Sequence, residues 1–169
     1  MEKYIFRKYE KLFKNLFQKE KKKIVKALGD KISVEHVGST AIEGLGGKGI
    51  IDIIVGIKIG RLNQYIALLE AQGYEFRKKA STPKRLFFRR DFWTFLKKRR
   101  IHIHLVKYNS KDWKEMISFR DFLNKHPDVV KEYSKLKKEA CLVANGDGQK
   151  YRGYKEEFIK RITKEALKN

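Results

Sequence analysis

The segment 36–57, HVGSTAIEGLGGKGIIDIIVGI, holds a Gly-Ser pair, a lysine and an aspartate whose types and spacing could do chemistry together. Gly38 and Ser39 can present backbone N–H groups and a hydroxyl to a chain of phosphates, and Asp52 can bind the Mg²⁺ that bridges such phosphates. Lys48, between them, can offset phosphate charge. Twelve residues, 40–51, separate Ser39 from Asp52. The segment therefore indicates phosphate and metal chemistry.

Two better-known phosphate loops do not fit this segment. GLGGKG, residues 44–49, satisfies G-x-G-x-x-G, but a dinucleotide fingerprint must open a helix, and the β-branched residues 50–55 predict a strand. A Walker A loop needs Ser or Thr after the lysine, whereas Gly49 follows Lys48. The remaining arrangement is a strand that ends in Gly-Ser, a short helical turn, and a strand that carries Asp52.

Histidines form a second candidate group. Residues 101–108 alternate as a strand, which puts His102 and His104 on the face opposite Ile101, Ile103 and Leu105. Together with Asp52 and His36, this pair could form a mixed metal site or a general acid/base pair; the alternative is a structural role. Histidine ligands would favour Mn²⁺ or Zn²⁺ over Mg²⁺.

Basic and aromatic residues supply further candidates, each with an ordinary alternative. Arg100 could neutralise a phosphate or simply be solvated. The pairs Tyr133/Lys137 and Tyr151/Lys155 share helix faces and could hold a base and a phosphate, or could be half-buried tyrosines beside snorkelling lysines.

Two more segments allow two interpretations. Residues 77–100 carry eleven Lys or Arg, one Asp and five interleaved aromatics, and either base stacking or inward packing explains this pattern. Arg120 and Asp121 could tie a helix to the sheet or bind a ligand.

These residues need elements to position them. Periodicity predicts a helix over 2–29 ending at Gly29, strands at 33–37, 50–57 and 101–108, and a helix over 61–71 closed by Gly73. Residues 74–95 predict strand-like blocks with a turn at 81–83, and 112–169 predict helices, one opening at Pro127 and the last near Gln149. We expect one domain, 1–169, with an N-terminal helix (1–29), a sheet core (30–110) and C-terminal helices (111–169).

Composition bounds the partners and the compartment. Lys and Arg number 41 against 20 acidic residues, a formal charge of +21, which favours polyanionic partners, including nucleic acid; a biased genome or a thermophilic source would also produce such a surface. No export signal or apolar membrane-spanning run is evident, so we expect a cytoplasmic protein without membrane partners. The single cysteine, Cys141, predicts an ordinary helix residue.

The Gly-Ser and Asp52 arrangement resembles the polymerase-β-like nucleotidyltransferases. More specifically, EHVGSTAIEGLGGKGIIDIIV (35–55) is similar to the pattern EHVGSTAVPGLxAKPIIDIxV of the GrpB family, a nucleotidyltransferase-like group. IHIHLV (101–106), FRDFLNKHP (119–127), YSKLKKEA (133–140) and YRGYKEEFI (151–159) resemble further blocks of that family in the same order. The chain departs at Glu43 and Gly49, where the family usually has proline. Ile54 stands where the wider superfamily has a second carboxylate, which puts a full two-metal mechanism in doubt.

The resemblance implies an α/β (α+β) fold of nucleotidyltransferase type: a mixed, mainly antiparallel small sheet flanked by helices, with a helical C-terminal section. It also implies metal-dependent transfer of a nucleotidyl group from an NTP to an unknown acceptor, with Mg²⁺ or Mn²⁺ as cofactor. The rival functions are a non-catalytic nucleotide or polyphosphate binder and a basic RNA-associated protein. The expected catalytic residues are Asp52, His102, His104 and Ser39; the nucleotide-binding residues Gly38, Ser39, Thr40, Lys48, Arg100, Tyr133, Lys137, Tyr151 and Lys155; and the metal ligands Asp52, His104 and His36.

Overall fold

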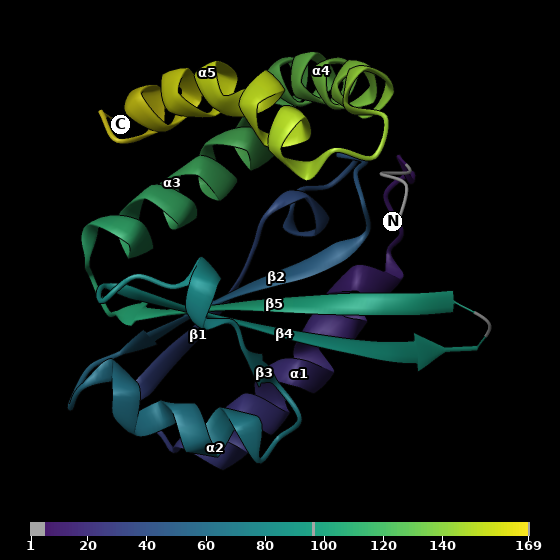
Figure 1. The fold of residues 1–169 in the computed structure, drawn as a ribbon. Helices are drawn as coiled ribbons and strands as arrows, with labels where there is room; N and C mark the ends of the chain where they lie inside the picture. Colours follow the sequence, from purple (N-terminus) through teal and green to yellow (C-terminus); the bar gives the residue numbers. More distant parts are fainter. Residues whose placement is uncertain (1–5, 96, 169) are drawn as a thin grey trace.

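A five-stranded sheet organises the structure, a computed structural model that describes residues 6–95 and 97–168 (Figure 1). The strand order is β1-β2-β5-β4-β3. Only β2 and β5 pair in parallel, and the other three neighbouring pairs are antiparallel. The predicted mixed, mainly antiparallel sheet is therefore confirmed. Its strands are β1 (Ile32–Val37), β2 (Ile50–Ile57), β3 (Glu75–Phe76), β4 (Arg85–Thr94) and β5 (Lys97–Lys107).

Helices cover both faces of this sheet (Figure 1). One face carries α1 (Leu12–Leu28) and α2 (Ile66–Glu70), and the other carries α3 (Lys111–Lys125), with α4 (Pro127–Ala144) and α5 (Gly148–Ala166) packed beyond it. Short 3₁₀ turns occupy η1 (Ser39–Ala41), η2 (Leu62–Tyr65) and η3 (Lys78–Ala80). In the part of the chain that the structure describes, no helix is both long and apolar enough to cross a membrane.

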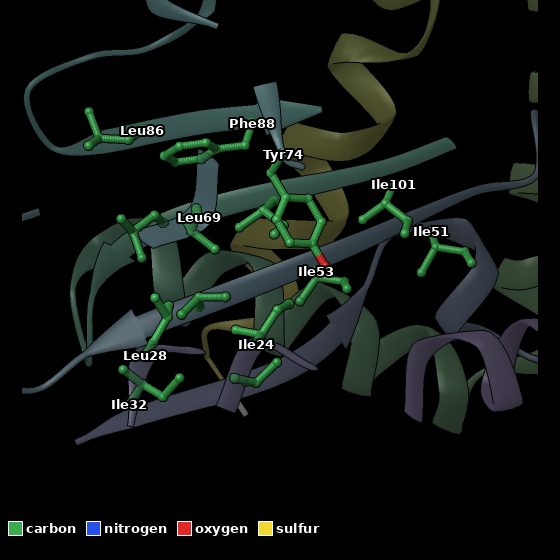
Figure 2. Packing of buried hydrophobic residues seen from close by; sticks show 14 of the residues in the cluster. Ile24, Leu28, Ile32, Ile51, Ile53, Leu69, Tyr74, Leu86, Phe88 and Ile101 are labelled. Carbon is green, nitrogen blue, oxygen red and sulfur yellow. The ribbon is translucent and has the colours of Figure 1, made fainter. Parts of the chain in front are cut away.

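The main core lies between the sheet and the α1/α2 layer, as Figure 2 shows. Alternation along the strands sends every second side chain into it, so that Ile51 and Ile53 of β2 are fully buried there. Burying a side chain of this size contributes about 1.5–3 kcal/mol. Ile101, Ile103 and Leu105 of β5 point to the same core, which confirms the predicted faces of that strand. His102, His104 and Asp52 consequently face the α3 layer.

Most predicted elements are present, but three boundaries were wrong. The helix predicted over 2–29 begins at Leu12. Before it, Arg7 forms a β-bridge with Gly47, so the apolar periodicity of residues 6–11 serves tertiary contacts; Tyr4 and Ile5 lie outside the described residues. The helix predicted over 61–71 is divided between η2 and α2. β5 begins at Lys97, four residues before the predicted 101, because β4 pairs with it along this length.

Helix ends follow the predicted signals. Gly29, with φ +82°, ends α1. Pro127 opens α4, and its missing N–H costs nothing in the first turn. Asp147 caps α5 by accepting hydrogen bonds from the backbone N–H groups of Gln149 (2.8 Å) and Lys150 (3.1 Å). Gly29 thus ends α1 on the opposite face of the sheet, whereas Pro127 and Asp147 start α4 and α5, which pack beyond α3 on the Asp52 side.

Candidate functional site

Asp52 and two histidines meet on the α3 face of the sheet. In the parallel pairing of β2 with β5, Asp52 lies beside His102, and Nδ1 of His102 is 3.1 Å from Asp52 Oδ1. Nε2 of His104 is 3.9 Å from the same oxygen. Burial raises the pKa of Asp52, but hydrogen bonds and charge from His102 and His104 outweigh it and hold the pKa well below its usual range. Asp52 is therefore a fixed anion whose Oδ1 is engaged by histidine.

The other carboxylate oxygen of Asp52 faces Gly38. Gly38 has φ +70° and lies where β1 ends, and a Cβ added there would overlap Asp52 Oδ2. Only glycine lets the backbone pass this close to the carboxylate. Ser39, the next residue, starts the 3₁₀ turn η1. The structure thus brings Gly38 to Asp52, with Ser39 next to it in the chain; their roles in binding phosphate stay a prediction.

Gly47 brings a lysine of α4 to the same loop. A Cβ on Gly47 would lie 2.5 Å from Lys137 Nζ and 2.8 Å from Ser39 Oγ, so these two atoms flank the glycine. Lys137 is 3% exposed and donates a hydrogen bond to the carbonyl of Gly46 (2.6 Å). Gly47 was not among the predicted site residues, although its place in a run of glycines was a signal of close approach.

Two further lysines join Lys137 and form the lysine cluster, Lys48, Lys137 and Lys155. The ammonium groups of Lys48 and Lys155 lie 5.0 Å and 4.2 Å from the ring centroid of Tyr151. The electron-rich face of a tyrosine ring attracts such cations and so eases the approach of like charges.

The electrostatics of the lysine cluster favour an added anion. Burial, followed by the charge of Lys155, lowers the pKa of Lys137 to about 7. Burial, followed by the charge of Lys48, lowers the pKa of Lys155 to about 8. Burial also lowers the pKa of Lys48. The charge of Asp52 raises the pKa in all three lysines without restoring the usual value. A bound polyanion would supply further negative charge, raise the pKa values of the three lysines and stabilise their charged forms.

Both tyrosines lie in positions that rule out the predicted stacking on a base. Tyr133 is 5% exposed, and its ring stacks on Phe158 at 4.6 Å between centroids. Tyr151 is 2% exposed and packs against Lys48 and Lys155. Both rings are buried by apolar packing between α4 and α5. The tyrosines therefore pack against the lysines of the cluster instead of contacting a ligand. In this respect the prediction for Tyr133 and Tyr151 was wrong.

His36 is not brought to Asp52. It points to the opposite face of the sheet, where its ring stacks on Phe17 of α1 (4.7 Å). Its Nε2 is 2.9 Å from the hydroxyl of Thr40, and burial lowers its pKa to about 4. Thr40 in turn donates a hydrogen bond to the carbonyl of Ile50. His36 and Thr40 therefore stabilise the loop between β1 and β2. The expected metal ligand His36 and phosphate ligand Thr40 therefore have structural partners.

Two arginines near the site are engaged in ion pairs. Arg100 donates two hydrogen bonds to Asp91 across the hairpin (2.7 and 2.9 Å). Arg120 of α3 donates to Glu35 (2.7 Å) and to the carbonyl of His36 (3.0 Å), and it also pairs with Asp121. Of the two roles open for Arg120, tying helix to sheet is the one that the contacts support.

The donor set at Asp52 suits a metal only in part. Within residues 6–95 and 97–168, no three His, Cys, Asp or Glu side chains are grouped so that they could hold a metal ion. Asp52 offers one carboxylate, and Nδ1 of His104 is buried without a hydrogen-bond partner among the described residues. Mg²⁺ is commonly bound by one or two carboxylates plus substrate phosphates, so one carboxylate fits an ion that arrives with its nucleotide.

Comparison with known proteins agrees with this arrangement of loop and strands. The GrpB protein family model matches residues 5–165. The chain belongs to the GrpB family. It is 35% identical over 158 residues to the glutamate-rich protein GrpB of Alkalihalophilus pseudofirmus, covering 90% of each chain. The UPF0157 protein YqkA of Bacillus subtilis is 28% identical over 160 residues, which are 94% of this chain and 46% of that longer protein.

A solved GrpB structure shares the whole fold. The crystal structure of conserved protein GrpB from Enterococcus faecalis has a TM-score of 0.84 and 28% identity to this chain, covering 97% of it and 98% of that chain. The mixed α/β architecture, with helices on both sides of the sheet, is therefore that of a GrpB protein.

The departures from the GrpB pattern have local explanations. Gly49 has φ +71°, which a proline ring, fixed near −65°, cannot adopt, so the backbone here differs from one with proline. Glu43 is exposed and pairs with Lys14 (3.4 Å). Ile54 is not such a departure, since the GrpB pattern also lacks the second carboxylate of the wider superfamily; it lies on the Asp52 face, fully buried against Val37, Val106 and Trp113. A second carboxylate at position 54 would be buried among apolar groups, so Asp52 is the only carboxylate that β2 offers.

Proposed function

We propose that this GrpB protein binds a nucleoside triphosphate at the lysine cluster and transfers its nucleotidyl group to an acceptor hydroxyl. One observation carries the proposal: three lysines with lowered pKa values lie within electrostatic reach of a fixed carboxylate, and one of them, Lys137, meets Ser39 at a glycine-lined loop. Crowding like charges at an apolar boundary is unfavourable unless an anion joins them. A polyphosphate has the charge density that this cluster lacks.

The proposed roles follow from position. Lys48, Lys137 and Lys155 neutralise the phosphates, and Ser39, beside Gly47 and Lys137, donates its hydroxyl to them. Asp52 Oδ2 would hold a divalent cation together with phosphate oxygens. When bound, that ion would supply charge stabilisation at the reacting phosphate.

Proton transfer falls to His102. Its Nδ1 lies at Asp52 Oδ1, so a proton on Nδ1 leaves Nε2 free to accept one, as in other carboxylate-oriented histidine bases. The acceptor oxygen attacks the α-phosphorus, its proton passes to His102 Nε2, and the bond from the α-phosphorus to the bridging oxygen breaks. Pyrophosphate leaves with the electron pair of the broken bond.

Removing the Ser39 hydroxyl tests transfer itself. Ser39→Ala should lower the rate of pyrophosphate release from an NTP by about a hundredfold, because a donor aimed at developing charge is worth roughly 2.7–4 kcal/mol. Ser118→Ala, which removes a hydroxyl from α3, is the matched control. Pyrophosphate release is measured with each of the four NTPs, Mg²⁺ or Mn²⁺, and cell-extract fractions as acceptors. Equal rates in wild type and Ser39→Ala would remove Ser39 from the reaction.

Asp52→Asn tests the metal-binding role. The substitution keeps the shape but removes the charge, so Mn²⁺-dependent NTP affinity should fall by on the order of tenfold or more. NTP affinity without metal should change little or rise, because a negative charge near the phosphates is lost. Titration calorimetry with and without Mn²⁺ distinguishes these effects, and an unchanged metal dependence would exclude Asp52 as a ligand.

A non-catalytic nucleotide or polyphosphate binder is the second candidate. The apolar surroundings of Ile54, which leave β2 with one carboxylate, favour it. It predicts tight NTP binding that depends on the lysine cluster, with no pyrophosphate released under any of the conditions above. This outcome would replace the enzyme with a binder and leave the ligand class unchanged.

A further inference from the structure

The hairpin of β4 and β5 projects beyond the rest of the sheet (Figure 1). β2 pairs with β5 only from Arg100 onward, so residues 97–99 pair with β4 alone. We call this projecting part, residues 92–95 and 97–99 of the described chain, the hairpin arm. It leaves the sheet at the end of β5 that lies next to Asp52.

The five aromatic residues of segment 77–100 fall into a packed group and an exposed group. Phe88 is fully buried and Phe92 packs against the main core, whereas Phe87 is half-buried on the Asp52 face, where its ring packs against those of His102 and His104. Trp93 is 69% exposed and Phe95 is 100% exposed, at the end of the hairpin arm. Packing therefore explains only part of the pattern, and two large aromatics remain in solvent.

Trp93 lies on the same face of the hairpin as the Asp52 site. The register pairs Arg89 with His102, Asp91 with Arg100 and Trp93 with Lys98, and directly paired residues share a face. A track thus runs from His102 past Arg100 to Trp93. At about 3.3 Å per residue, the four steps from Arg89 to Trp93 span roughly 13 Å.

The charge of this track is positive. Asp91 is shared by Arg100 and Lys98 (3.2 Å), so one carboxylate meets two cations. The positive charge of Arg100 contributes to lowering the pKa of Lys48, which places the track within electrostatic reach of the lysine cluster. Exposed aromatics beside cations are the features that bind single strands, because every base has a face that can stack.

We propose that the hairpin arm docks single-stranded nucleic acid by stacking bases on Trp93 and Phe95, and that the track leads the end of that strand to Asp52. The first half stands on the hairpin arm alone, and the second, in which the strand is the acceptor, rests on the proposed function. Arg100 and Lys98 on the track would contact the phosphates of the bound strand.

Oligonucleotide binding tests the docking. Oligo(U) and oligo(dT) should bind the full chain and quench the fluorescence of exposed Trp93, since the second tryptophan, Trp113, is 8% exposed. Replacing both aromatics, Trp93→Ala with Phe95→Ala, should weaken binding on the order of tenfold for each ring removed. The salt dependence, about −0.7 in log–log slope per phosphate contact, should be unchanged, because no charge is lost.

Control variants distinguish base stacking on the hairpin arm from nonspecific apolar binding. Leu142→Ala removes an apolar side chain that is 81% exposed on α4 and should leave oligonucleotide binding unchanged. Asp52→Asn should retain oligonucleotide binding, and the double aromatic variant should retain NTP binding, so failure of either proposal is visible without the other. Equal oligonucleotide affinity in wild type and double variant would overturn the proposal. So would Trp93-dependent binding to anionic phospholipid vesicles with none to oligonucleotides.

Discussion

Gly38→Ala is expected to reduce the proposed nucleotidyl transfer by on the order of a thousandfold or more, because the new Cβ occupies the space of Asp52 Oδ2 and must displace the carboxylate. Even a shift of about 1 Å in a catalytic group can cost roughly a hundredfold in rate. The positive φ of Gly38 adds backbone strain of about 1–3 kcal/mol for a residue with a side chain. Pyrophosphate release and thermal unfolding should be measured on the same preparation.

Gly44→Ala is the matched control for this strain. Gly44 has φ +77°, close to the +70° of Gly38, but nothing lies within 4 Å of its added Cβ. Both variants should lose similar stability from backbone strain, while only Gly38→Ala should lose transfer. If the two variants kept equal activity, the contact between Gly38 and Asp52 would have no part in the site.

Lys137→Met should stabilise the protein at pH 7 and remove much of its nucleotide affinity. The fall in pKa from the usual 10.5 to about 7 corresponds to roughly 5 kcal/mol of unfavourable burial of the charged form. The unfolded chain binds more protons between pH 7 and 10.5, so the unfolding free energy of the wild type rises with pH across this window. Methionine cannot titrate, so the difference between variant and wild type should shrink over the same window.

Denaturant unfolding at pH 7, 8.5 and 10 measures this difference. Lys48, Lys155, Asp52 and Cys141 also act on Lys137, but they are present in both proteins and largely cancel. Lys135→Met, an exposed lysine on the same helix, should show no such trend. Calorimetry at pH 8 adds a second measure, because phosphate binding should draw a proton onto Lys137 that the methionine variant cannot take up. A pH-independent difference in unfolding free energy would contradict burial of a titrating lysine.

Local patterns in the sequence predicted the strands well and the site in part. The alternation of residues 101–105 put His102 and His104 on one face, and the Gly-Ser motif put Gly38 beside Asp52, because strand periodicity and one short loop determine both arrangements. The extent of α1 was predicted wrongly, since the contact between Arg7 and Gly47 joins segments forty residues apart in the chain. Such a contact leaves no local pattern.

Roles that depend on packing between helices were the least predictable. Tyr133 and Lys137 share a helix face as expected. The Tyr133 ring is nevertheless buried against Phe158 of α5, while the Lys137 ammonium reaches the carbonyl of Gly46. Neither contact can be predicted without the packing of the helices. His36 was predicted to join Asp52, His102 and His104 in a mixed metal site, but strand alternation sends it to the α1 face. The same alternation, applied to β1 as it was to β5, would have predicted this.

The parallel pairing of β2 with β5 also has a consequence for how the chain folds during synthesis. Asp52 pairs with His102, so β2 must wait for its second partner, β5, which is made fifty residues later. At about 5–20 residues per second, that wait lasts roughly 3–10 s. During it, the apolar run of Ile50 to Ile57 has only β1 beside it and one unpaired edge, which is the kind of surface that recruits other chains. Overproduction of this protein should therefore be limited by aggregation of nascent chains, and slower growth at low temperature with abundant chaperone should improve its yield.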